Sequence, residues 1–176
     1  CDRAIHLVDQ LLTLSRLEAA AGPTMAAVDL SALVRQVVAD LAPKAIAKGQ
    51  SLELEAAVPC AFACNDVLVS VLVQNLIDNA LRYCPASSNI LITVRAQGAG
   101  VLLRVEDDGP GMAEADIARL GERFFRVTGS EEVGSGLGWS IVRRIADAHH
   151  LFITIAHSQA LGGLSVTLSS GTPAVE

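Results

Sequence analysis

The chain has 176 residues, of which 51% are hydrophobic, 18% charged and only 3% aromatic, so its core must be built mainly from aliphatic side chains. This length and hydrophobic content allow one domain with an appendage and argue against global disorder. The formal net charge of −6, without a basic cluster interleaved with aromatic residues, argues against a nucleic-acid partner. No apolar run reaches the length of a membrane-spanning helix.

Residues 2–19 predict a helix, because apolar residues recur from Ala4 to Leu14 with three-four spacing. The apolar stripe is wide, which favours burial against other helices in a bundle or a dimer. Gly22 and Pro23 then predict the end of the helix and a domain boundary. Residues 1–22 are therefore expected to form a separate helical segment with a linker.

Four cysteines, Cys1, Cys60, Cys64 and Cys84, form no C-x-x-C pair, and no histidine has zinc-finger spacing to them. We interpret them as small buried hydrophobic residues of a reducing compartment, which points weakly to the cytoplasm. The chain starts with cysteine rather than methionine, inside a helical pattern, so we interpret it as a fragment of a longer protein.

Residues 23–170 predict a second domain of alternating helices and strands. The expected helices span residues 31–48, 66–83, 113–120 and 137–150. The expected strands span residues 28–30, 51–56, 61–64, 89–96, 101–107, 151–155 and 164–168. Ser31 and Asn65 are the expected N-caps of the first two helices, and polar residues 97–100 predict a hairpin. Residues 171–176 are expected to be a frayed tail.

The helix over residues 66–83 carries an unusual polar stripe. Asn75 and Asn79 lie four residues apart, so their carboxamides share one face, and Arg82 borders that face. A buried amide costs free energy unless its donors and acceptors are satisfied, either by the fold or by a ligand. Taken alone, such a pair is more typical of a structural role.

Two glycine-rich stretches favour a ligand instead. Residues 108–111, D-G-P-G, end a strand, and a carboxylate there could accept a hydrogen bond from an amine in a dry pocket. Residues 134–138, G-S-G-L-G, open a helix whose free amides favour phosphate. The lysine of a P-loop is absent, and the strand that a dinucleotide fingerprint needs before its glycines is also absent.

The order of these motifs resembles the ATP-binding catalytic domain of sensor histidine kinases and, more broadly, the gyrase, Hsp90 and MutL type of ATPase. Residues 75–83 look like the N box of that family, 108–111 like its G1 box, 123–126 like its F box and 134–138 like its G2 box. The resemblance covers roughly residues 28–170. The opening helix resembles the second helix of the family's dimerisation domain.

The resemblance implies an α/β fold, in which about three helices cover one face of a mixed, mostly antiparallel sheet. It implies that the carboxamide oxygen of Asn79 would coordinate Mg²⁺ bridging the phosphates of ATP. Asn75 would contact phosphate or order the waters of the metal ion. Arg82, where the family more often has lysine, would pair with phosphate, and Tyr83 would flank the nucleotide.

At the other end of the nucleotide, the resemblance implies that Asp108 accepts a hydrogen bond from the adenine amino group. Gly109 and Gly111 would let the backbone approach the base. The implied residues of a mobile loop over the triphosphate and of its root are Gly134, Gly136, Leu137, Gly138, Phe125 and Arg126. Arg126 would be available to the γ-phosphate. Trp139 is bulkier than the small aliphatic residue usual at that position and either packs beneath this loop or fills the core.

The leading hypothesis is therefore the catalytic domain of a two-component sensor histidine kinase. ATP hydrolases of the superfamily have glutamate as general base where this chain has Asn75, which favours phosphoryl transfer over hydrolysis. The phosphoacceptor histidine would lie on a dimerisation helix absent from this fragment. The implied partners are that helix, a second protomer and a response regulator, and the implied location is the cytoplasmic side of the inner membrane. The alternatives are an ATP-dependent clamp or hydrolase, and a nucleotide-binding scaffold without catalysis.

Overall fold

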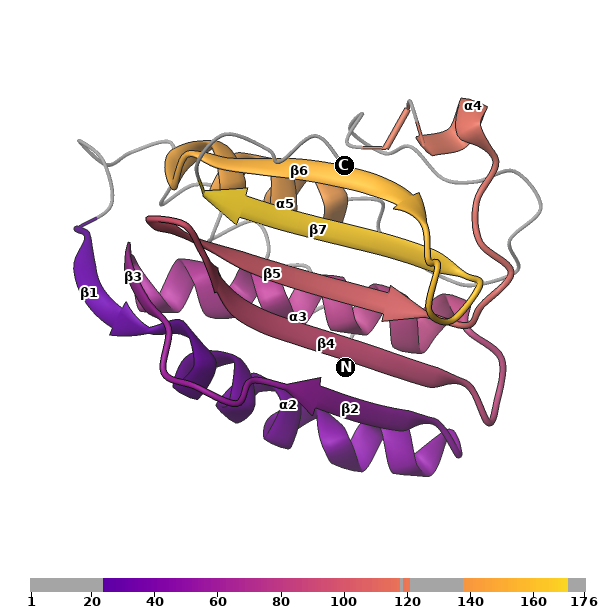
Figure 1. Cartoon of the computed structure of the whole chain (residues 1–176). Helices are drawn as coiled ribbons and strands as arrows, with labels where there is room; N and C mark the ends of the chain where they lie inside the picture. Colours follow the sequence, from indigo (N-terminus) through magenta and orange to yellow (C-terminus); the bar gives the residue numbers. More distant parts are fainter. Residues whose placement is uncertain (1–23, 118, 121–137, 171–176) are drawn as a thin grey trace, which may run out of the picture.

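The computed structural model describes residues 24–117, 119–120 and 138–170 (Figure 1). Its helices are α2 (Leu30–Ala47), α3 (Asp66–Tyr83), α4 (Glu114–Ile117) and α5 (Gly138–Ala148). Its strands are β1 (Ala26–Asp29), β2 (Ser51–Glu55), β3 (Ala61–Cys64), β4 (Asn89–Gln97), β5 (Gly100–Asp107), β6 (Leu151–His157) and β7 (Leu164–Ser170). Each element falls within a few residues of the span expected from the sequence.

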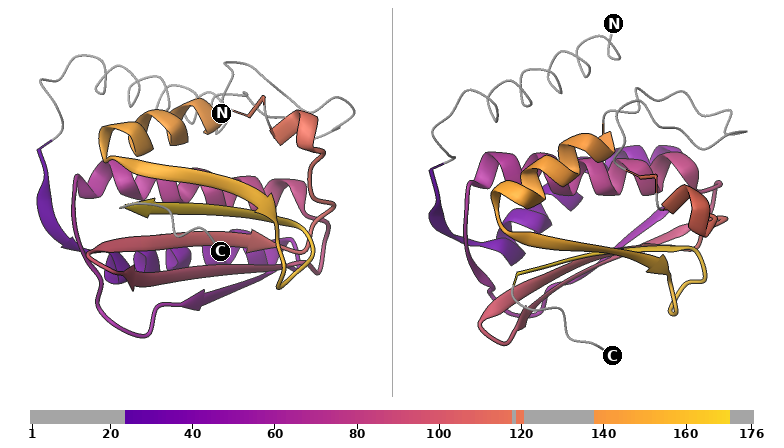
Figure 2. Two further views of the ribbon diagram at one scale, coloured as in Figure 1. Left: turned by 45° about the horizontal axis from the view of Figure 1, so that its top comes forward. Right: turned by 90° about the horizontal axis from the view of Figure 1, so that it is seen from above.

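Within the described residues, the main sheet has five strands in the order β2-β4-β5-β7-β6. Strand β2 runs parallel to β4, and the other neighbouring strands are antiparallel. Strands β1 and β3 form a separate antiparallel pair. Helices α2, α3 and α5 lie together on one face of the main sheet (Figures 1 and 2). The predicted α/β sandwich with a mixed, mostly antiparallel sheet is confirmed.

The caps of the two long helices follow directly from the sequence, with one correction. Asn65 caps α3 as predicted, because its side-chain oxygen accepts a hydrogen bond from the Leu68 N–H at 3.0 Å. The cap of α2 is Asp29 rather than Ser31, since the Asp29 carboxylate accepts from the Ser31 N–H. The Ser31 hydroxyl instead donates to the Val58 carbonyl at 2.8 Å. The same oxygen, Asp29 Oδ1, also accepts from the Cys60 N–H at 3.0 Å, so this carboxylate holds both the helix start and the segment before β3.

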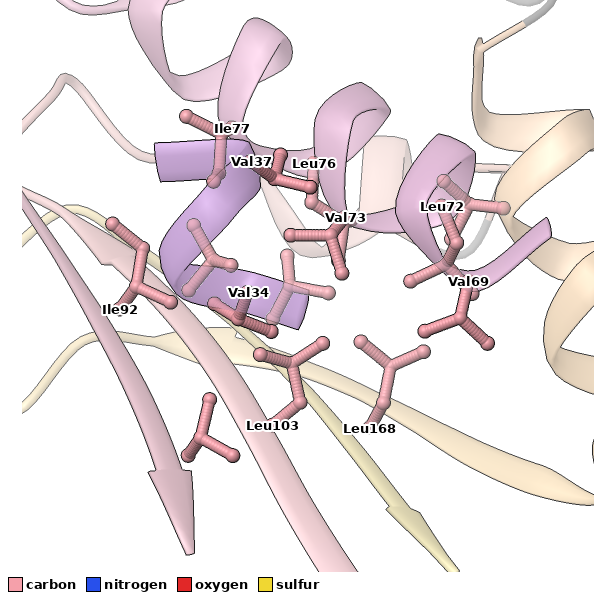
Figure 3. Close-up of a cluster of buried hydrophobic side chains, with 14 of the residues drawn as sticks. Val34, Val37, Val69, Leu72, Val73, Leu76, Ile77, Ile92, Leu103 and Leu168 are labelled. Atoms are coloured by element: carbon pink, nitrogen blue, oxygen red, sulfur yellow. The ribbon is translucent and has the colours of Figure 1, made fainter. Parts of the chain in front are cut away.

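Aliphatic side chains fill the space between the helices and the sheet. Figure 3 labels Val34, Val37, Val69, Leu72, Val73, Leu76, Ile77, Ile92, Leu103 and Leu168 of this core. The side chain of Ile77 is fully buried, so truncating it to alanine would cost about 2–5 kcal/mol of stability. Asn75 and Asn79 are therefore carried by a helix whose apolar face packs in the core.

The C-terminal end of α3 is held by the segment that follows α2. Lys48 Nζ donates to the Leu81 carbonyl at 2.7 Å, and Gln50 Nε2 donates to the Cys84 carbonyl at 2.9 Å. These bonds satisfy carbonyl groups that a helix end leaves without partners. The last turn of α3, which carries Tyr83, is thereby fixed relative to the sheet.

None of the described helices is both long and apolar enough to span a membrane. The predicted helix over residues 2–19 and the predicted tail over residues 171–176 lie outside the described residues. The division of the chain at residue 22 therefore stays a prediction.

Candidate nucleotide-binding site

A cavity of about 60 Å³ lies between the C-terminal half of α3, the ends of β5 and β7, and the first turn of α5. Its lining is mostly apolar, with a few polar groups. The lining residues are Leu76, Asn79, Ala80, Tyr83, Cys84, Val105, Asp107, Pro110, Met112, Trp139, Leu164 and Val166. Leu76, Asn79, Ala80 and Tyr83 thus share the face of α3 that the helical spacing predicts.

The two amides of α3 meet the start of α5. A Cβ atom added to Gly138 would lie 3.1 Å from Asn75 Oδ1 and 3.8 Å from Asn79 Oδ1. Both carboxamides therefore point to the same place, as their four-residue spacing predicts. Glycine at position 138 lets the α5 backbone approach these amides more closely than a side chain would allow.

The two amides differ in how the fold uses them. Asn75 is buried, and its Nδ2 donates to the Val71 carbonyl one turn earlier at 2.8 Å. Asn79 lines the cavity, and its Nδ2 is buried with no hydrogen-bond partner in the described residues. An unsatisfied buried amide costs about 1–3 kcal/mol. Asn79 is therefore the amide whose hydrogen-bonding capacity the described fold leaves incompletely used.

Asp107, the last residue of β5, supplies the carboxylate in the cavity wall. One of its oxygens, Oδ1, accepts from the Gly109 N–H at 3.0 Å and from the Leu164 N–H at 3.1 Å. Its exposure is only 9%. Oδ1 is thus committed to two backbone donors, and Oδ2 takes part in neither of these two bonds.

Asp108, the carboxylate predicted from the sequence, contacts a different part of the fold. Its Oδ2 accepts from the Asn89 N–H at 2.9 Å and from Asn89 Nδ2 at 3.0 Å, at the start of β4. Partial burial raises the pKa of Asp108, but hydrogen bonds from the Asn89 backbone, the Ser88 hydroxyl and the Asn89 amide together hold it below its ordinary value. Asp108 does not line the cavity.

Strand alternation could have distinguished the two aspartates. Leu103 and Val105 of β5 face the helices and belong to the core. Side chains alternate with period two along a strand, so Asp107 continues the inward set and Asp108 does not. Strand alternation therefore indicates Asp107, whereas the D-G-P-G motif indicates Asp108.

Cys84 lies beside Asp107 and was not predicted to be part of the site. Burial, followed by the neighbouring Asp107 carboxylate, raises the pKa of Cys84 to about 12, and the thiol hydrogen-bonds to that carboxylate. A Cβ atom added to Gly109 would lie 2.7 Å from Cys84 Sγ. The thiol therefore packs directly beneath the turn that follows Asp107, and it is protonated at neutral pH.

The turn between β6 and β7 completes this end of the cavity. Gly163 donates its N–H to the Asp107 carbonyl at 3.0 Å, and a Cβ atom added to Gly163 would lie 2.4 Å from that carbonyl oxygen. Gly111 has φ +69° and packs against the imidazole of His157, 3.1 Å from where its own Cβ would lie. Glycine is required at position 163 by close approach and favoured at position 111 by backbone conformation.

The remaining predicted residues are distributed as follows. Tyr83 lines the cavity and is 40% exposed, whereas Arg82 is half-buried and lies outside the lining. Phe125, Arg126, Gly134, Gly136 and Leu137 lie outside the described residues. Leu164, Met112 and Trp139 line the cavity, and of these only Trp139 was considered from the sequence.

A larger groove of about 490 Å³ runs between α2 and the N-terminal part of α3. None of the predicted nucleotide-binding residues lines it, and it is an open surface feature. The smaller cavity is the better candidate site, because the amide of Asn79, the carboxylate of Asp107 and the closely packed glycines converge there.

Residues 65–172 match the model of the family described as histidine kinase-, DNA gyrase B-, and HSP90-like ATPase. The chain belongs to this family. The matched region contains α3, the cavity and the main sheet apart from β2. The resemblance inferred from the ordered motifs is thereby confirmed.

Among relatives of this ATPase family, the chain is 38% identical over 170 residues to the sensor protein QseC of Salmonella typhimurium. That alignment covers 96% of this chain and 37% of QseC. The chain is 36% identical over 168 residues to the sensor protein kinase PmrB of Pseudomonas aeruginosa, covering 94% of this chain and 35% of PmrB. It thus spans little more than a third of the length of these relatives.

The crystal structure of full-length ShkA in complex with AMPPNP has the same fold, with a TM-score of 0.81. The sequence identity is 28%, and the match covers 96% of this chain and 36% of ShkA. Relatives named as sensor proteins and a protein kinase support the histidine kinase branch of the ATPase family over its other branches.

Proposed function

We propose that this chain is the catalytic domain of a sensor histidine kinase, and that it binds Mg-ATP and transfers the γ-phosphoryl group to a histidine. The observation that carries the proposal is the convergence of three features on one cavity. These are the amide of Asn79 and the buried carboxylate of Asp107, which line the cavity, and Gly138, which opens α5 against Asn79 and the neighbouring Asn75. Phosphoryl transfer needs mainly positioning and charge neutralisation, which such a constellation provides.

At the end of the cavity where the nucleobase would lie, Asp107 would accept the hydrogen bond from the adenine amino group that the family resemblance assigned to Asp108. Oδ2 of Asp107 can accept a hydrogen bond from an exocyclic amino group, since Oδ1 is already committed to Gly109 and Leu164. Adenine carries an amino group at a position where guanine carries a carbonyl oxygen. A carboxylate would repel that carbonyl, so this end of the cavity favours adenine.

At the phosphate end, Asn79 fits a magnesium ion. Its carboxamide lines the cavity. The oxygen Oδ1 is the atom that could coordinate the ion, whereas the buried Nδ2, which has no hydrogen-bond partner in the described structure, could donate to a phosphate oxygen. Mg²⁺ prefers oxygen ligands and is commonly held by one or two protein groups together with substrate phosphates and waters. When bound, the ion would neutralise phosphate charge, and Asn79 would hold it. Arg82 and, beyond the described residues, Arg126 are further candidates to pair with phosphate.

Phosphoryl transfer is favoured over hydrolysis, because no described residue that lines the cavity near the two amides could act as a general base. Asn75 cannot accept a proton as a general base, and its Nδ2 is already held by Val71. Among the described lining residues the one carboxylate is Asp107, at the base end. An external nucleophile, a histidine on the dimerisation helix, would therefore receive the phosphoryl group.

The proposed partners and location follow from this assignment. In the intact protein the domain would act within a homodimer on its dimerisation and phosphoacceptor helix, and a response regulator would then take the phosphoryl group. The domain would work on the cytoplasmic side of the inner membrane, to which the rest of the protein is anchored. The names of the relatives as sensor proteins support this setting.

Calorimetry with Mg-ATP tests the proposal directly. We expect binding by the wild-type chain, and an Asn79→Ala variant that stays folded but loses Mg-dependent binding. Gln74→Ala is the matched control, because Gln74 is an exposed amide on the same helix and should leave binding unchanged. Normal Mg-ATP binding by Asn79→Ala would refute the assignment of Asn79.

Transfer is tested by supplying the dimerisation helices, with their histidine, as a separate protein. We expect acid-labile phosphate on the added histidine and little on this chain alone. Steady release of inorganic phosphate from ATP, abolished by Asn75→Ala and without transfer, would favour an ATP hydrolase instead. Nucleotide binding with neither transfer nor phosphate release would indicate a regulatory scaffold.

A further inference from the structure

Trp139 lines the cavity at a position where the family usually has a small aliphatic residue. It is the second residue of α5 and the sole tryptophan of the chain. Its side chain is partly buried, packs against the core, and lines the same cavity as Asp107. The indole therefore packs against the core and at the same time forms part of the cavity wall.

The first turn of α5 reaches both ends of the site. Gly138 faces the amides of Asn75 and Asn79, where phosphates would lie. Trp139, the next residue, reaches the part of the cavity bounded by Asp107, Leu164 and other apolar side chains. A purine has apolar faces and a polar edge, so a carboxylate at the edge and an aromatic ring at the face are complementary to it.

The cavity is smaller than a usual ligand site, so one of its walls must move when a nucleobase binds. Ligand sites usually enclose about 300–1,000 Å³, several times more than this cavity of about 60 Å³. The α3 wall is fixed by Lys48 and Gln50, and the β5 and β7 walls are hydrogen-bonded within the sheet. Trp139 stands in the first turn of its helix, where backbone N–H groups have no partner within the helix. Trp139 and Met112 are the large lining side chains outside α3, β5 and β7, so they can shift as a base enters.

We propose that Trp139 is an aromatic contact of the nucleobase in addition to Tyr83, with its indole packing against the face of the ring whose edge is held by Asp107. The inference rests on the proposed nucleotide site and adds a residue that contributes affinity for the base. Stacking of a base on an aromatic side chain is worth about 1–3 kcal/mol by alanine substitution, which is about a 5- to 150-fold change in affinity.

The intrinsic fluorescence of the wild-type chain tests the contact without any substitution. Saturation with ADP should lower the tryptophan emission and reduce its quenching by acrylamide, because the base covers the indole. Magnesium tripolyphosphate, which has no base, should leave both signals unchanged. A rise in acrylamide quenching with ADP would mean that the base expels the indole into solvent, and would overturn the proposal.

Substitutions then measure the contribution to affinity by calorimetry. Trp139→Leu should weaken ADP and Mg-ATP by the same factor, about 5- to 20-fold, because leucine keeps part of the apolar contact. Trp139→Phe should stay within about threefold of the wild type. Phe152→Leu is the matched control, since Phe152 is an aromatic residue 53% exposed on β6 and outside the cavity.

The two proposals fail in different ways. If the wild-type chain binds neither ADP nor Mg-ATP, the proposed function fails and this inference fails with it. If the wild type binds both, but Trp139→Leu retains its melting temperature and binds them equally well, only the role of Trp139 is refuted. An unfolded Trp139→Leu leaves the fluorescence and acrylamide measurements on the wild type to decide.

Discussion

Asp107 and Asp108 are consecutive residues whose carboxylates contact opposite neighbours of β5. Asp107 accepts from the Leu164 N–H at the start of β7, whereas Asp108 accepts from Asn89 at the start of β4. Asp107 lines the cavity and Asp108 does not. Both carboxylates therefore connect neighbouring strands, but only that of Asp107 also lies in the wall of the cavity.

This difference predicts opposite outcomes for two isosteric substitutions. Asp107→Asn should weaken ATP binding by about 10- to 150-fold, since a charged acceptor is worth about 1.5–3 kcal/mol and an amide could present a donor to the adenine amino group. Asp108→Asn should change affinity by less than about threefold. Calorimetry on both variants, with circular dichroism to confirm folding, measures this. Greater loss in Asp108→Asn would restore the assignment made from the sequence.

Replacing Gly163 with alanine should destabilise the fold. The added Cβ would lie 2.4 Å from both the carbonyl oxygen and Oδ1 of Asp107, and backbone atoms cannot move aside cheaply. We expect a loss of about 1–3 kcal/mol in the free energy of unfolding, measured by urea denaturation. Gly162→Ala is the comparison, because Gly162 has open space around it but φ +88°. A smaller loss at position 163 than at position 162 would contradict the tight contact.

His149 should make the fold sensitive to mild acid. The Asn65 N–H donates to His149 Nε2 at 3.1 Å, so the ring proton is on Nδ1, which lies 2.7 Å from the Ile145 carbonyl. Burial, which disfavours the charged imidazolium, lowers the pKa of His149 below its ordinary value of 6.5. A second ring proton would also have to face the Asn65 N–H. The unfolded chain therefore binds more protons, and stability falls as the pH drops through 6.5 toward the folded-state pKa.

Urea denaturation between pH 7.5 and pH 5 measures this loss of stability. In a His149→Gln variant the part of the acid dependence due to this residue should disappear, although the overall stability should be lower. His150→Asn is the control, because His150 has φ +54° and asparagine tolerates that conformation. If His149→Gln and the wild type lose the same free energy over this range, the buried ring is not responsible.

Cys84 should resist alkylation while the protein is folded. Its pKa of about 12, raised first by burial and then by Asp107, leaves a negligible fraction of thiolate at pH 8. We expect iodoacetamide to label Cys84 at least about 100-fold more slowly in the native chain than in urea, as read by peptide mass spectrometry. Rapid labelling of the native chain would show that the thiol is neither buried nor held by Asp107.

Much of the fold could be predicted because local signals agreed with tertiary packing. The cap at Asn65 and the breaker after Tyr83 define α3, and strict alternation defines β2. The cap of α2 could not be assigned from local sequence alone, because Asp29 also bonds the Cys60 N–H, a residue 31 positions away. This tertiary contact decides between Asp29 and Ser31, which are both good capping residues.

The candidate site was predictable where one element carries it and less so where several meet. Asn75 and Asn79 follow from helical spacing within α3. Cys84 and Leu164 join the site through contacts between the end of α3, the end of β5 and the start of β7, which no local pattern reports. Asp107 was predictable in part, because period-two alternation along β5 places its side chain on the face toward the helices.

The place of β7 in the sheet has a consequence for biosynthesis. It is the last described strand of the chain, yet it lies between β5 and β6 and carries the Leu164 N–H that fixes Asp107. A nascent chain that has emerged only as far as β6 therefore leaves β5 with an open edge and Asp107 without this donor. The nucleotide pocket should consequently form only after translation has passed residue 170, and ATP should bind only a nascent chain that includes β7.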